Sequence, residues 1–455
     1  TQSTWGEHGR ILFEVVPRQS SQFSQLSNST KRGNIDFTNL SHIMSINLDT
    51  YGNGGRASST IKSIFFSKMT IRTLVPLILG LTALLCILQL GKGSEPPCYF
   101  PAIYNFGDSN SDTGGKSASF SPNPPPNGEG FFHRAEGRDG DGRLIIDFTA
   151  ERLKVPYLSA YLDSIGANFR HGTNFASGGA TIERPNETFY DFGVSPFYLN
   201  TQLQQFDQFK SRTAALFQQV QNSPDALKLP RSEDFAKALY ILDIGQNDLT
   251  MGFRLFSLTK LRSLIPGIVE QLADAVTHLY NEGGRSFWIH NTGPHGCMPV
   301  NVLFNSSPPS VGYLDEHGCV KSKNEMAMLF NQVLKVRVEK LRAELPLAAI
   351  TYVDVYSAKQ WLVANAKALG LADPMTVCCG YHVKDDHVWC GFKGRVGDRE
   401  ITGPSCKDPS KFVSWDGVHY TEFSNRWVAD HTQNGSFSDP PIPITQACIR
   451  RYSKL

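Results

Sequence analysis

The sequence lacks an excess of charge of either sign, and only 19% of its 455 residues are charged. The 44 lysines and arginines nearly balance the 42 aspartates and glutamates, so the formal net charge is +2. A nucleic-acid-binding protein needs a basic excess to neutralise phosphates, and we therefore expect no nucleic-acid partner. The chain is 40% hydrophobic and 11% aromatic, which excludes disorder of the whole chain and predicts a large packed core.

Long hydrophobic runs are scarce, and the one run that could enter a membrane follows Met69. Arg72 places a positive charge ahead of it, Leu74–Leu90 form the apolar stretch, and the small residues of Gly91–Ser94 follow. This order of segments is typical of a secretory signal peptide. An uncleaved signal anchor and a buried core helix are the alternatives, although the run is slightly short for a spanning helix.

This run divides the chain into three parts. We expect residues 69–93 to be a signal peptide, and residues 94–455 to form a single domain without stable membrane insertion after cleavage. Residues 1–68 are rich in Ser, Asn, Gln and Thr without a sustained period, so we expect a non-native or disordered leader there. In a secreted chain, glycans are expected at the Asn-x-Ser/Thr sequences that begin at Asn186, Asn305 and Asn434.

Cysteine use fits an oxidising compartment. Of the nine cysteines, Cys86 lies in the apolar run, and the others are Cys98, Cys297, Cys319, Cys378, Cys379, Cys390, Cys406 and Cys448. An even number in a secreted chain predicts up to four disulfides. We assign only the pair of Cys297 with Cys319, because these residues flank one loop rich in Pro and Ser.

The segment from Cys378 to Cys390 has a second interpretation. Together with His382 and His387 it holds enough sulfur and nitrogen ligands for a zinc ion. In an oxidising compartment, disulfides are the preferred interpretation of the same cysteines. We therefore expect neither a metal nor another cofactor.

The body of the chain alternates short apolar runs with longer helical stretches. Buried parallel strands are predicted at Ala102–Phe106, Leu239–Ile244, Ser286–His290 and Ile350–Val355. Helices are predicted over Leu261–Tyr280, with the stripe Leu264, Ile268, Leu272, Val276 and Leu279, and over Glu325–Leu341, with the stripe Leu329, Val333, Val336 and Leu341. This alternation predicts an α/β fold with a mainly parallel sheet covered on both faces. The Gly-rich, charged span Gly128–Gly142 is predicted to be a loop.

Polar residues of the kinds used in catalysis follow these elements. Ser109 comes directly after the first strand, where its hydroxyl can be exposed and the amides of the next turn can stabilise an oxyanion. Asn247 follows the second strand and carries a side-chain amide suited to the same task. Asp416 and His419 can meet on one face of a helical turn, where the carboxylate orients the imidazole as a base.

Each motif taken alone has a plainer interpretation. The first is then a turn that caps a helix, the second an Asx turn, and the third a surface Asp–His pair. Aromatic residues near these motifs are candidates for an acyl pocket, with core packing as the default, and they are Phe131, Phe132 and Trp415. His295 is expected near the pocket. The sequence contains no Gly-x-Ser-x-Gly elbow, P-loop or His-Glu-x-x-His motif.

The combination of motifs resembles a known family, the plant GDSL esterase/lipases of the SGNH hydrolase superfamily. The resemblance extends from about Cys98 to Trp427 and rests on four blocks in the family's order, Gly107–Gly115, Asn174–Ala180, Gly245–Asp248 and Asp416–His419. The residues from Leu239 to Phe253 are most similar to the early-nodulin and acetylesterase-like branch. The resemblance implies a three-layer α/β/α, flavodoxin-like fold for a single catalytic domain.

The resemblance also implies roles for individual residues. Ser109 would be the nucleophile, His419 the general base and then acid, and Asp416 the orienting carboxylate. The backbone amide of Ser109, the amide of Gly179 in preference to Gly178, and the side chain of Asn247 would form the oxyanion hole.

The implied activity is that of a carboxylic ester hydrolase. We expect a monomeric enzyme, secreted to the apoplast or cell wall with the vacuole as an alternative, that removes short acyl or acetyl groups from plant carbohydrate or specialised metabolites. Lipid esters are a further candidate. The alternatives are an acyltransferase with the same triad and a non-catalytic carbohydrate-binding wall protein.

Overall fold

The computed structural model describes residues 96–185, 193–220, 222–304, 310–383 and 386–449. The expected leader and signal peptide lie outside these residues, and so do Asn186 and Asn305 of the expected glycan sites. Asn434 is described, and it is exposed directly after a helix. Within the described ranges, no helix is both long enough and apolar enough to cross a membrane.

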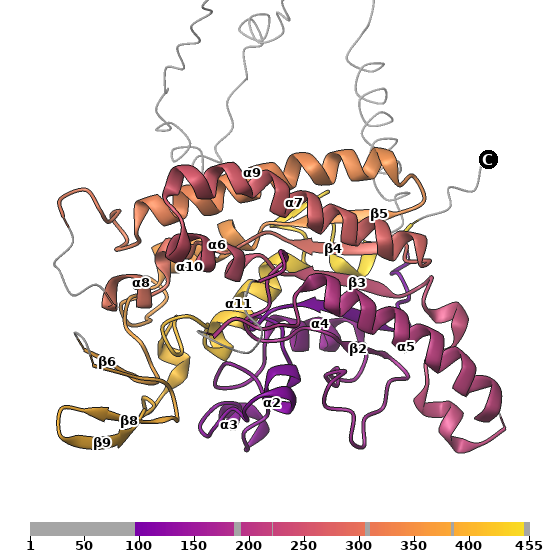
Figure 1. The fold of residues 1–455 in the computed structure, drawn as a ribbon, viewed down its shortest axis with the longest axis horizontal. Coiled ribbons are helices and arrows are strands. Elements are labelled where there is room, and N and C mark those ends of the chain that lie inside the picture. The colour runs from indigo at the N-terminus through magenta and orange to yellow at the C-terminus, as the bar shows by residue number, and fades with distance from the viewer. Residues whose placement is uncertain (1–95, 186–192, 221, 305–309, 384–385, 450–455) are drawn as a thin grey trace, which may run out of the picture. The chain divides into compact units, whose positions relative to one another are not determined.

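A six-stranded sheet forms the centre of the described structure, in the order β10-β5-β4-β3-β1-β2 (Figure 1). Its strands are β1 (Ile103–Gly107), β2 (Gly172–Asn174), β3 (Leu239–Asp243), β4 (Ser286–His290), β5 (Ala349–Val353) and β10 (Ser438–Asp439). All neighbours pair in parallel except β10, which is antiparallel to β5. The predicted mainly parallel sheet is thereby confirmed, and each of the four predicted strands matches an observed strand within two residues at both ends.

Helices cover both faces of this sheet (Figure 1). They are α2 (Gly115–Ser119), α3 (Glu129–Phe132), α4 (Ile145–Leu153), α5 (Leu199–Val220), α6 (Gln246–Leu255), α7 (Leu258–Asn281), α8 (Val300–Leu303), α9 (Lys321–Glu344), α10 (Val355–Asn365) and α11 (Glu422–Gln433). The prediction of a loop over Gly128–Gly142 was wrong for its first part, because α3 lies there. This helix is a single turn, too short to show an apolar period.

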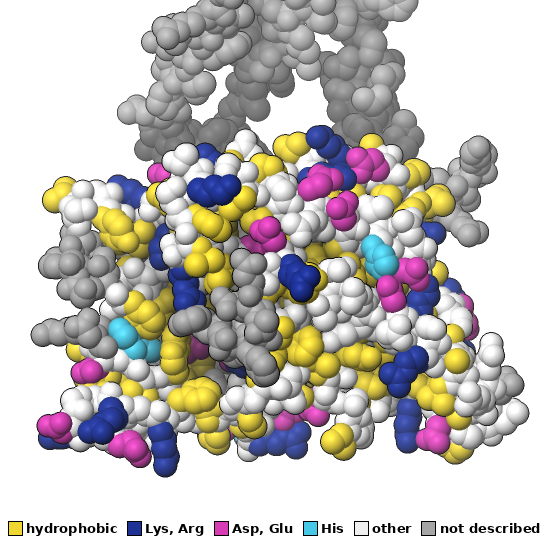
Figure 2. All heavy atoms as spheres, in the orientation of Figure 1, with side chains coloured by type: hydrophobic (Ala, Val, Ile, Leu, Met, Phe, Trp, Pro, Cys, Tyr) yellow, Lys and Arg dark blue, Asp and Glu magenta, His cyan; other side chains and the backbone are white. Residues whose placement is uncertain are grey.

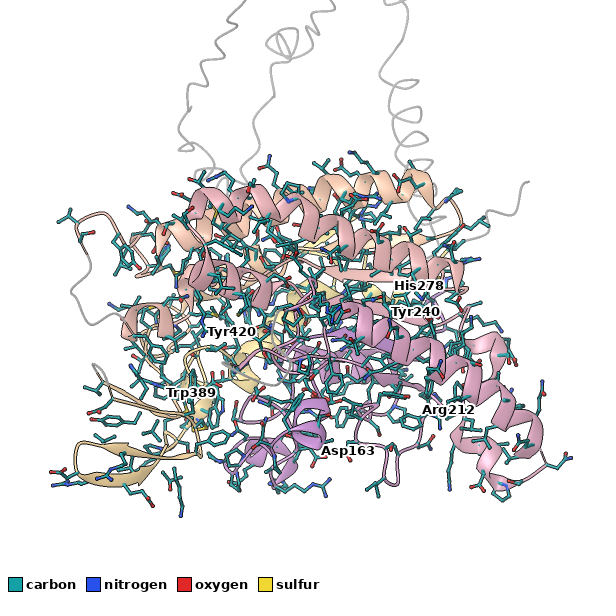
Figure 3. All side chains as sticks on the ribbon, viewed as in Figure 1. Asp163, Arg212, Tyr240, His278, Trp389 and Tyr420 are labelled. Carbon is teal, nitrogen blue, oxygen red and sulfur yellow. A yellow bond between two sulfur atoms is a disulfide. The ribbon has the colours of Figure 1, made fainter. Side chains whose placement is uncertain are left out.

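The alternation of side chains along the strands explains the three layers. Tyr104 and Tyr240 (labelled in Figure 3) belong to the apolar cluster shared with α5, α7 and α9. Ile103 and Leu239, their neighbours in sequence, belong to the cluster shared with α4, α10 and α11. Successive strand residues point to opposite faces, so each apolar strand supplies both cores. The expected α/β/α architecture is therefore confirmed.

One predicted helix face was wrong. Val336 was placed on the buried stripe of α9, but its side chain is 49% exposed. The buried positions of this helix include Met326, Phe330, Leu334, Val338 and Leu341. These residues follow the three- and four-residue spacing of one helix face. The predicted stripe lay about one residue, or 100°, from that face, because apolar residues border it on the side of Leu329 and Val333.

Four disulfides connect the eight described cysteines. They are Cys98–Cys448, Cys297–Cys319, Cys378–Cys406 and Cys379–Cys390. The assignment of Cys297 with Cys319 is confirmed. All three cysteines considered as zinc ligands, Cys378, Cys379 and Cys390, form disulfides. These bonds lie in a region of two hairpins, β6 (Tyr381–Val383) with β7 (Asp386–Val388) and β8 (Lys393–Val396) with β9 (Arg399–Thr402).

The ends of β1 and β3 lie level with each other at the edge of the sheet that carries the polar motifs. Gly107 is the register partner of Asp243, and the Asp108 amide donates a hydrogen bond to the Asp243 carbonyl at 3.2 Å. A Cβ atom on Gly107 would lie 2.7 Å from that carbonyl oxygen and 2.4 Å from Ser111 Oγ, so a glycine is required here. The residues that follow both strands therefore emerge side by side.

Candidate active site

Ser109 is held at the carboxyl end of β1 by a tight turn. The carboxylate oxygen Oδ1 of Asp108 accepts hydrogen bonds from the backbone N–H of Asn110 at 3.0 Å and from its side-chain amide at 2.8 Å. This Asx turn encloses the serine between two anchored neighbours. Ser109 itself is partly exposed and lines a pocket, as the strand-end position predicted.

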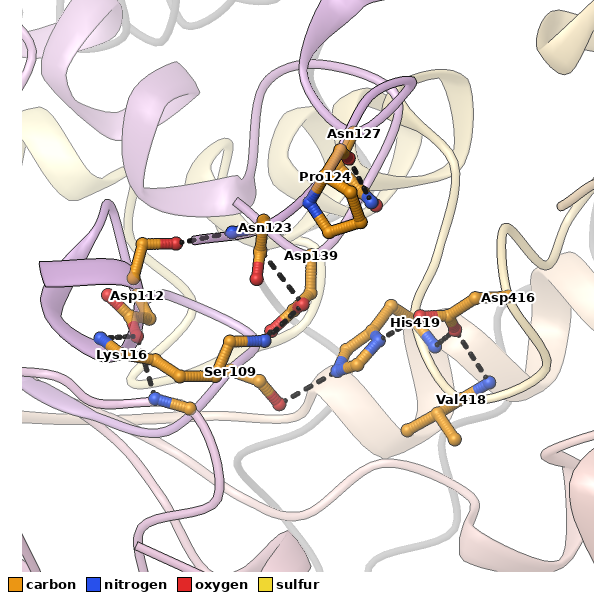
Figure 4. A network of polar contacts seen from close by, with 12 residues as sticks. Ser109, Asp112, Lys116, Asn123, Pro124, Asn127, Asp139, Asp416, Val418 and His419 are labelled. Atoms are coloured by element: carbon orange, nitrogen blue, oxygen red, sulfur yellow. Dashed lines mark hydrogen bonds and ion pairs between the residues drawn. The ribbon is translucent and has the colours of Figure 1, made fainter. Parts of the chain in front are cut away.

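The structure brings Ser109, His419 and Asp416 together (Figure 4). His419 Nε2 lies 2.8 Å from Ser109 Oγ, and its other ring nitrogen, Nδ1, lies 2.6 Å from Asp416 Oδ2. The serine and the histidine are 310 positions apart in the sequence. This hydroxyl–imidazole–carboxylate chain has the geometry in which a histidine activates a serine.

The local structure around Asp416 and His419 differs from the prediction. We expected the pair on a helical turn, but the segment is an irregular loop, and α11 begins only at Glu422. Asp416 Oδ1 accepts the backbone N–H groups of Val418 at 2.9 Å and His419 at 2.7 Å. Because one carboxylate oxygen closes the turn, the other is left to face the imidazole.

Burial and charge set the protonation of this pair. Burial alone would raise the pKa of the Asp416 carboxyl, but the charge and hydrogen bonds of His419 outweigh it and lower the pKa to about 2. Burial alone would lower the pKa of His419, yet the carboxylates of Asp416 and Asp139 outweigh it and raise the pKa above its ordinary value. Lys116 opposes that rise. Asp416 therefore stays ionised over the range in which His419 titrates.

Asp112 organises the neighbouring backbone, although the sequence analysis gave it no role. Its carboxylate accepts N–H groups from Gly114, Gly115 and Lys116, and it also accepts the Gly178 amide at 2.7 Å. It thus connects the serine block to the block Asn174–Ala180, which belongs to a distant part of the chain. The signal was present in the sequence, since a short acidic side chain before a Gly pair is typical of a turn acceptor.

Lys116 and Asp139 form an ion pair beside the imidazole (Figure 4). Lys116 Nζ lies 2.6 Å and 2.8 Å from the two carboxylate oxygens of Asp139, and Asn123 donates to the same carboxylate at 3.0 Å. The pair fastens α2 to the loop after α3. Neither residue was predicted, because nothing in their local sequence indicates a shared location.

Asn247 lies in the first turn of α6 rather than in an Asx turn. Its side-chain amide donates to the Ala180 carbonyl at 2.9 Å. The next residue, Asp248, accepts the backbone N–H groups of Ile182 at 2.9 Å and Glu183 at 3.0 Å. The start of α6 is thereby held against the end of the second block, and Asn247 faces the same pocket as Ser109 and His419.

The pocket is lined by polar side chains together with apolar surface. Its lining consists of Ser109, Asn110, Gln246, Asn247, Thr250, Gly293, Pro294, Met298, Lys359, Val418, His419 and Tyr420. His295 lies just behind this lining, as expected, because its Nε2 is 3.0 Å from Thr250 Oγ1. Burial lowers the pKa of His295 to about 3, so this ring is neutral.

The three aromatic candidates for the pocket lie elsewhere. Trp415 is a core residue whose Nε1 donates to the Asn127 side chain at 2.9 Å. Phe131 and Phe132 contact Tyr157 and the guanidinium groups of nearby arginines. Core packing, the default interpretation, holds for Trp415, and the other two rings pack among side chains outside the pocket lining.

Comparisons with known proteins give the family. The sequence profile described as GDSL-like Lipase/Acylhydrolase matches residues 103–432. A GDSL esterase/lipase of Arabidopsis thaliana is 60% identical over 370 residues, which cover 81% of this chain and 95% of that protein. The GDSL esterase/lipase ENOD8 of Medicago truncatula is 43% identical over 85% of this chain and 100% of its own length. A protein of Arabidopsis thaliana named Alpha-L-fucosidase 3 is 43% identical over 83% of this chain and 100% of its own length.

These matches confirm the resemblance that the four motif blocks indicated, including its similarity to the ENOD8 branch. They extend over most of the described domain, well beyond the motifs themselves. The chain therefore belongs to the GDSL-like lipase/acylhydrolase family, and it is a carboxylic ester hydrolase of the plant GDSL esterase/lipase group.

Proposed function

We propose that this ester hydrolase is a secreted serine esterase that removes short acyl groups through an acyl-Ser109 intermediate. The observation that supports this most directly is the contact chain from Ser109 Oγ to His419 Nε2 at 2.8 Å and from His419 Nδ1 to Asp416 Oδ2 at 2.6 Å. A serine hydroxyl is a weak nucleophile until a neighbouring base accepts its proton. The arrangement supplies both that base and the carboxylate that orients it.

The reaction proceeds in two halves. His419 accepts the Ser109 proton while Oγ attacks the ester carbonyl carbon, and the resulting imidazolium is stabilised by the Asp416 carboxylate. The imidazolium then protonates the leaving alcohol, and the acyl group remains on Ser109. In the second half His419 activates a water molecule, which attacks the acyl carbon and releases the acid.

Three N–H groups are suited to stabilise the oxyanion of each tetrahedral intermediate. We assign them to the backbone amides of Ser109 and Gly179 and to the side chain of Asn247. The Gly178 amide is occupied by Asp112 at 2.7 Å, which supports the choice of Gly179. An Asn side chain has two N–H bonds, so Asn247 can donate one to Ala180 and the other to the oxyanion.

The pocket lining supports short acyl groups as substrates. Most of its residues are polar, and the apolar contribution comes mainly from Pro294, Met298 and Val418. A long alkyl chain would leave these polar side chains without water. We therefore propose acetyl or other short esters on plant carbohydrate or specialised metabolites, ahead of lipid esters.

Secretion is proposed from the signal peptide assigned to residues 69–93 and from the cysteines. Eight cysteines paired in four disulfides fit an oxidising compartment such as the apoplast or cell wall, with the vacuole as an alternative. Asn434 is exposed, as a glycan acceptor must be. We propose that the secreted protein is residues 94–455, acting as a monomer.

The test is a comparison of wild type with Ser109→Ala, secreted from plant cells. Wild type should hydrolyse 4-nitrophenyl acetate faster than the decanoate and react with a fluorophosphonate at Ser109. Ser109→Ala should lose both activities, whereas the exposed control Ser263→Ala should keep them. Full esterase activity in Ser109→Ala would refute the mechanism.

Two further assays on the same samples separate the alternatives. Ester products formed with an added alcohol acceptor would show an acyltransferase, which uses the same triad. Release of 4-nitrophenol from 4-nitrophenyl α-L-fucoside would show a glycosidase activity, as in the name of the relative Alpha-L-fucosidase 3. If Ser109→Ala keeps that activity, its catalytic residues lie outside this triad.

A further inference from the structure

Lys359 is a buried cation that the proposed mechanism does not use. It lies on α10, and only 6% of its surface is exposed, yet it contributes to the pocket lining. Its Nζ atom is 3.4 Å from the side-chain oxygen of Asn110 and 4.4 Å from the ring centre of Tyr420. Figure 3 labels Tyr420, which belongs to the loop between the hairpins and α11. One ammonium group therefore contacts the residue after Ser109 and the residue after His419.

Two buried carboxylates lie close to this ammonium. Asp108 precedes Ser109, and Asp243 ends β3 and lies 3.3 Å from the ring of His290. Burial lowers the pKa of Lys359, and the charges of Asp243 and Asp108 oppose that shift. Burial and the charge of Asp243 raise the pKa of the Asp108 carboxyl to about 7, and Lys359 opposes that rise. The second oxygen of Asp108, Oδ2, is buried and accepts no hydrogen bond from any described residue. Without a nearby cation, an ionised Asp108 would place an uncompensated negative charge in a buried position next to Ser109.

Room for the lysine is provided by a glycine. A Cβ atom on Gly293 would lie 3.1 Å from Lys359 Cδ and 3.6 Å from its Nζ. A larger residue in this strand-end loop would thus press on the lysine stem. The long side chain reaches the pocket from α10 through this gap.

We propose that Lys359 is a positioning residue for ester hydrolysis, whose ammonium joins the Ser109 turn to the His419 loop and offsets the carboxylates of Asp108 and Asp243. The inference rests on the proposed function of the triad. The first part of the proposal is geometric. Lys359 contacts Asn110, whose backbone and side-chain N–H groups donate to Asp108, and Ser109 lies between these two residues in the turn. Its second part is electrostatic, because an oxyanion and a buried carboxylate of the same sign repel each other in a low dielectric.

The test compares three variants of the full chain. Lys359→Met keeps the length of the side chain and removes its charge, Lys359→Arg keeps the charge, and Lys367→Met removes an exposed charge just beyond α10 as the control. With 4-nitrophenyl acetate, Lys359→Met should lose about 10- to 100-fold in kcat with little change in KM, since a misplacement of about 1 Å can cost about 10²-fold. Lys359→Arg should recover part of that loss, and Lys367→Met should match wild type.

The pH profile distinguishes positioning from packing. The charged groups around His419 are Asp416, Asp139 and Lys116, and Lys359 lines the same pocket beside Tyr420. Loss of that cation favours the imidazolium, so the acid limb of kcat should move to higher pH in Lys359→Met and return in Lys359→Arg. A side chain that only fills space would leave the limb unchanged.

Contrary outcomes are equally clear. A folded Lys359→Met with kcat within twofold of wild type and an unmoved acid limb would overturn the inference. If Lys359→Met does not fold, Asn110→Ala tests the same link from the partly exposed side, and a wild-type kcat there would overturn it as well. Because Ser109→Ala is measured in parallel, an active Ser109→Ala indicates failure of the proposed function, and an inactive one confines the failure to Lys359.

Discussion

At the scale of single residues, the site depends on which hydrogen-bonding groups are already occupied. Asp416 uses one oxygen for its own turn and the other for His419. Asp112 accepts the Gly178 amide, so in the proposed mechanism the Gly179 amide is the one that binds the oxyanion. Residue types alone do not distinguish neighbours such as Gly178 and Gly179, whereas the occupied Gly178 amide favours Gly179 in the proposed oxyanion hole.

The first prediction concerns the oxyanion. Replacing Asn247 by Ala removes one of the three proposed donors, so kcat for 4-nitrophenyl acetate should fall by about 10²–10³-fold with KM little changed. Steady-state kinetics measures both quantities. The matched control is Asn365→Ala, on the surface of α10. A kcat for Asn247→Ala within threefold of wild type would remove Asn247 from the oxyanion hole.

The second prediction concerns pH. Because the pKa of His419 is raised, mainly by Asp416, the base becomes protonated and activity declines already as the pH falls through values above the ordinary imidazole pKa. Asp416→Asn removes that negative charge, so the acid limb should shift to lower pH while kcat falls by about 10⁴-fold. A kcat profile from pH 4 to pH 9 measures both effects. An acid limb that stays in place in Asp416→Asn would contradict the assigned pairing.

At the scale of elements, buried ion pairs hold the loops that carry the site to the helices behind them. Arg138 donates two hydrogen bonds to Asp147 of α4, at 2.8 Å and 2.7 Å, and both side chains are almost fully buried. Asp147 also accepts the backbone N–H of Leu144 at 2.8 Å and so caps α4. The carboxylate of Asp147 therefore holds the loop that contains Arg138 and Asp139 against α4.

The third prediction follows from this arrangement. Asp147→Ala leaves the Arg138 charge buried without its partner and should lower the free energy of unfolding by about 3–5 kcal/mol. Asp430→Ala, which breaks an exposed pair with Arg152, should cost less than about 1 kcal/mol. Urea denaturation with intact disulfides measures both. Equal effects of the two substitutions would show that burial of the first pair is unimportant.

At the scale of the whole molecule, the covalent links span very different lengths of chain. Cys98–Cys448 joins residues 350 positions apart, whereas Cys379–Cys390 joins residues only 11 apart. The first connects the segment before β1 to the segment after β10. Basic and acidic side chains are interspersed over the face of the molecule seen in Figure 2, in line with the net charge of +2.

The fourth prediction uses this difference in span. The double substitution Cys98→Ser with Cys448→Ser should lower the free energy of unfolding by about 2–5 kcal/mol, because the unfolded chain regains the freedom of a very long loop. Cys379→Ser with Cys390→Ser opens a much shorter loop and should cost less on this account. Thermal unfolding of the two double variants gives the order, and the reverse order would contradict the loop-length argument.

Much of the fold and the site was readable from local patterns. Short buried strands and Ser109 directly after β1 are features of neighbouring residues, and the family's four blocks fixed the order of the rest. The stripe through Val336 was misplaced because the apolar residues Leu329 and Val333 border one side of the true face of α9. The helical turn expected at Asp416 was wrong, since a three-residue spacing fits an Asx turn as well as a helix.

The amino-acid sequence by itself determined the α/β alternation and the Cys297–Cys319 pair, and it supplied the proposal of Ser109, His419 and Asp416 as the triad. Only the tertiary structure decided that Asp112 reaches Gly178, that Asp139 and Lys116 flank His419, and that Lys359 lies between the loops of Ser109 and His419. The physical reason is that periodicity and turn chemistry act between near neighbours. Contacts between residues hundreds of positions apart depend instead on how the packed layers bring strand ends together.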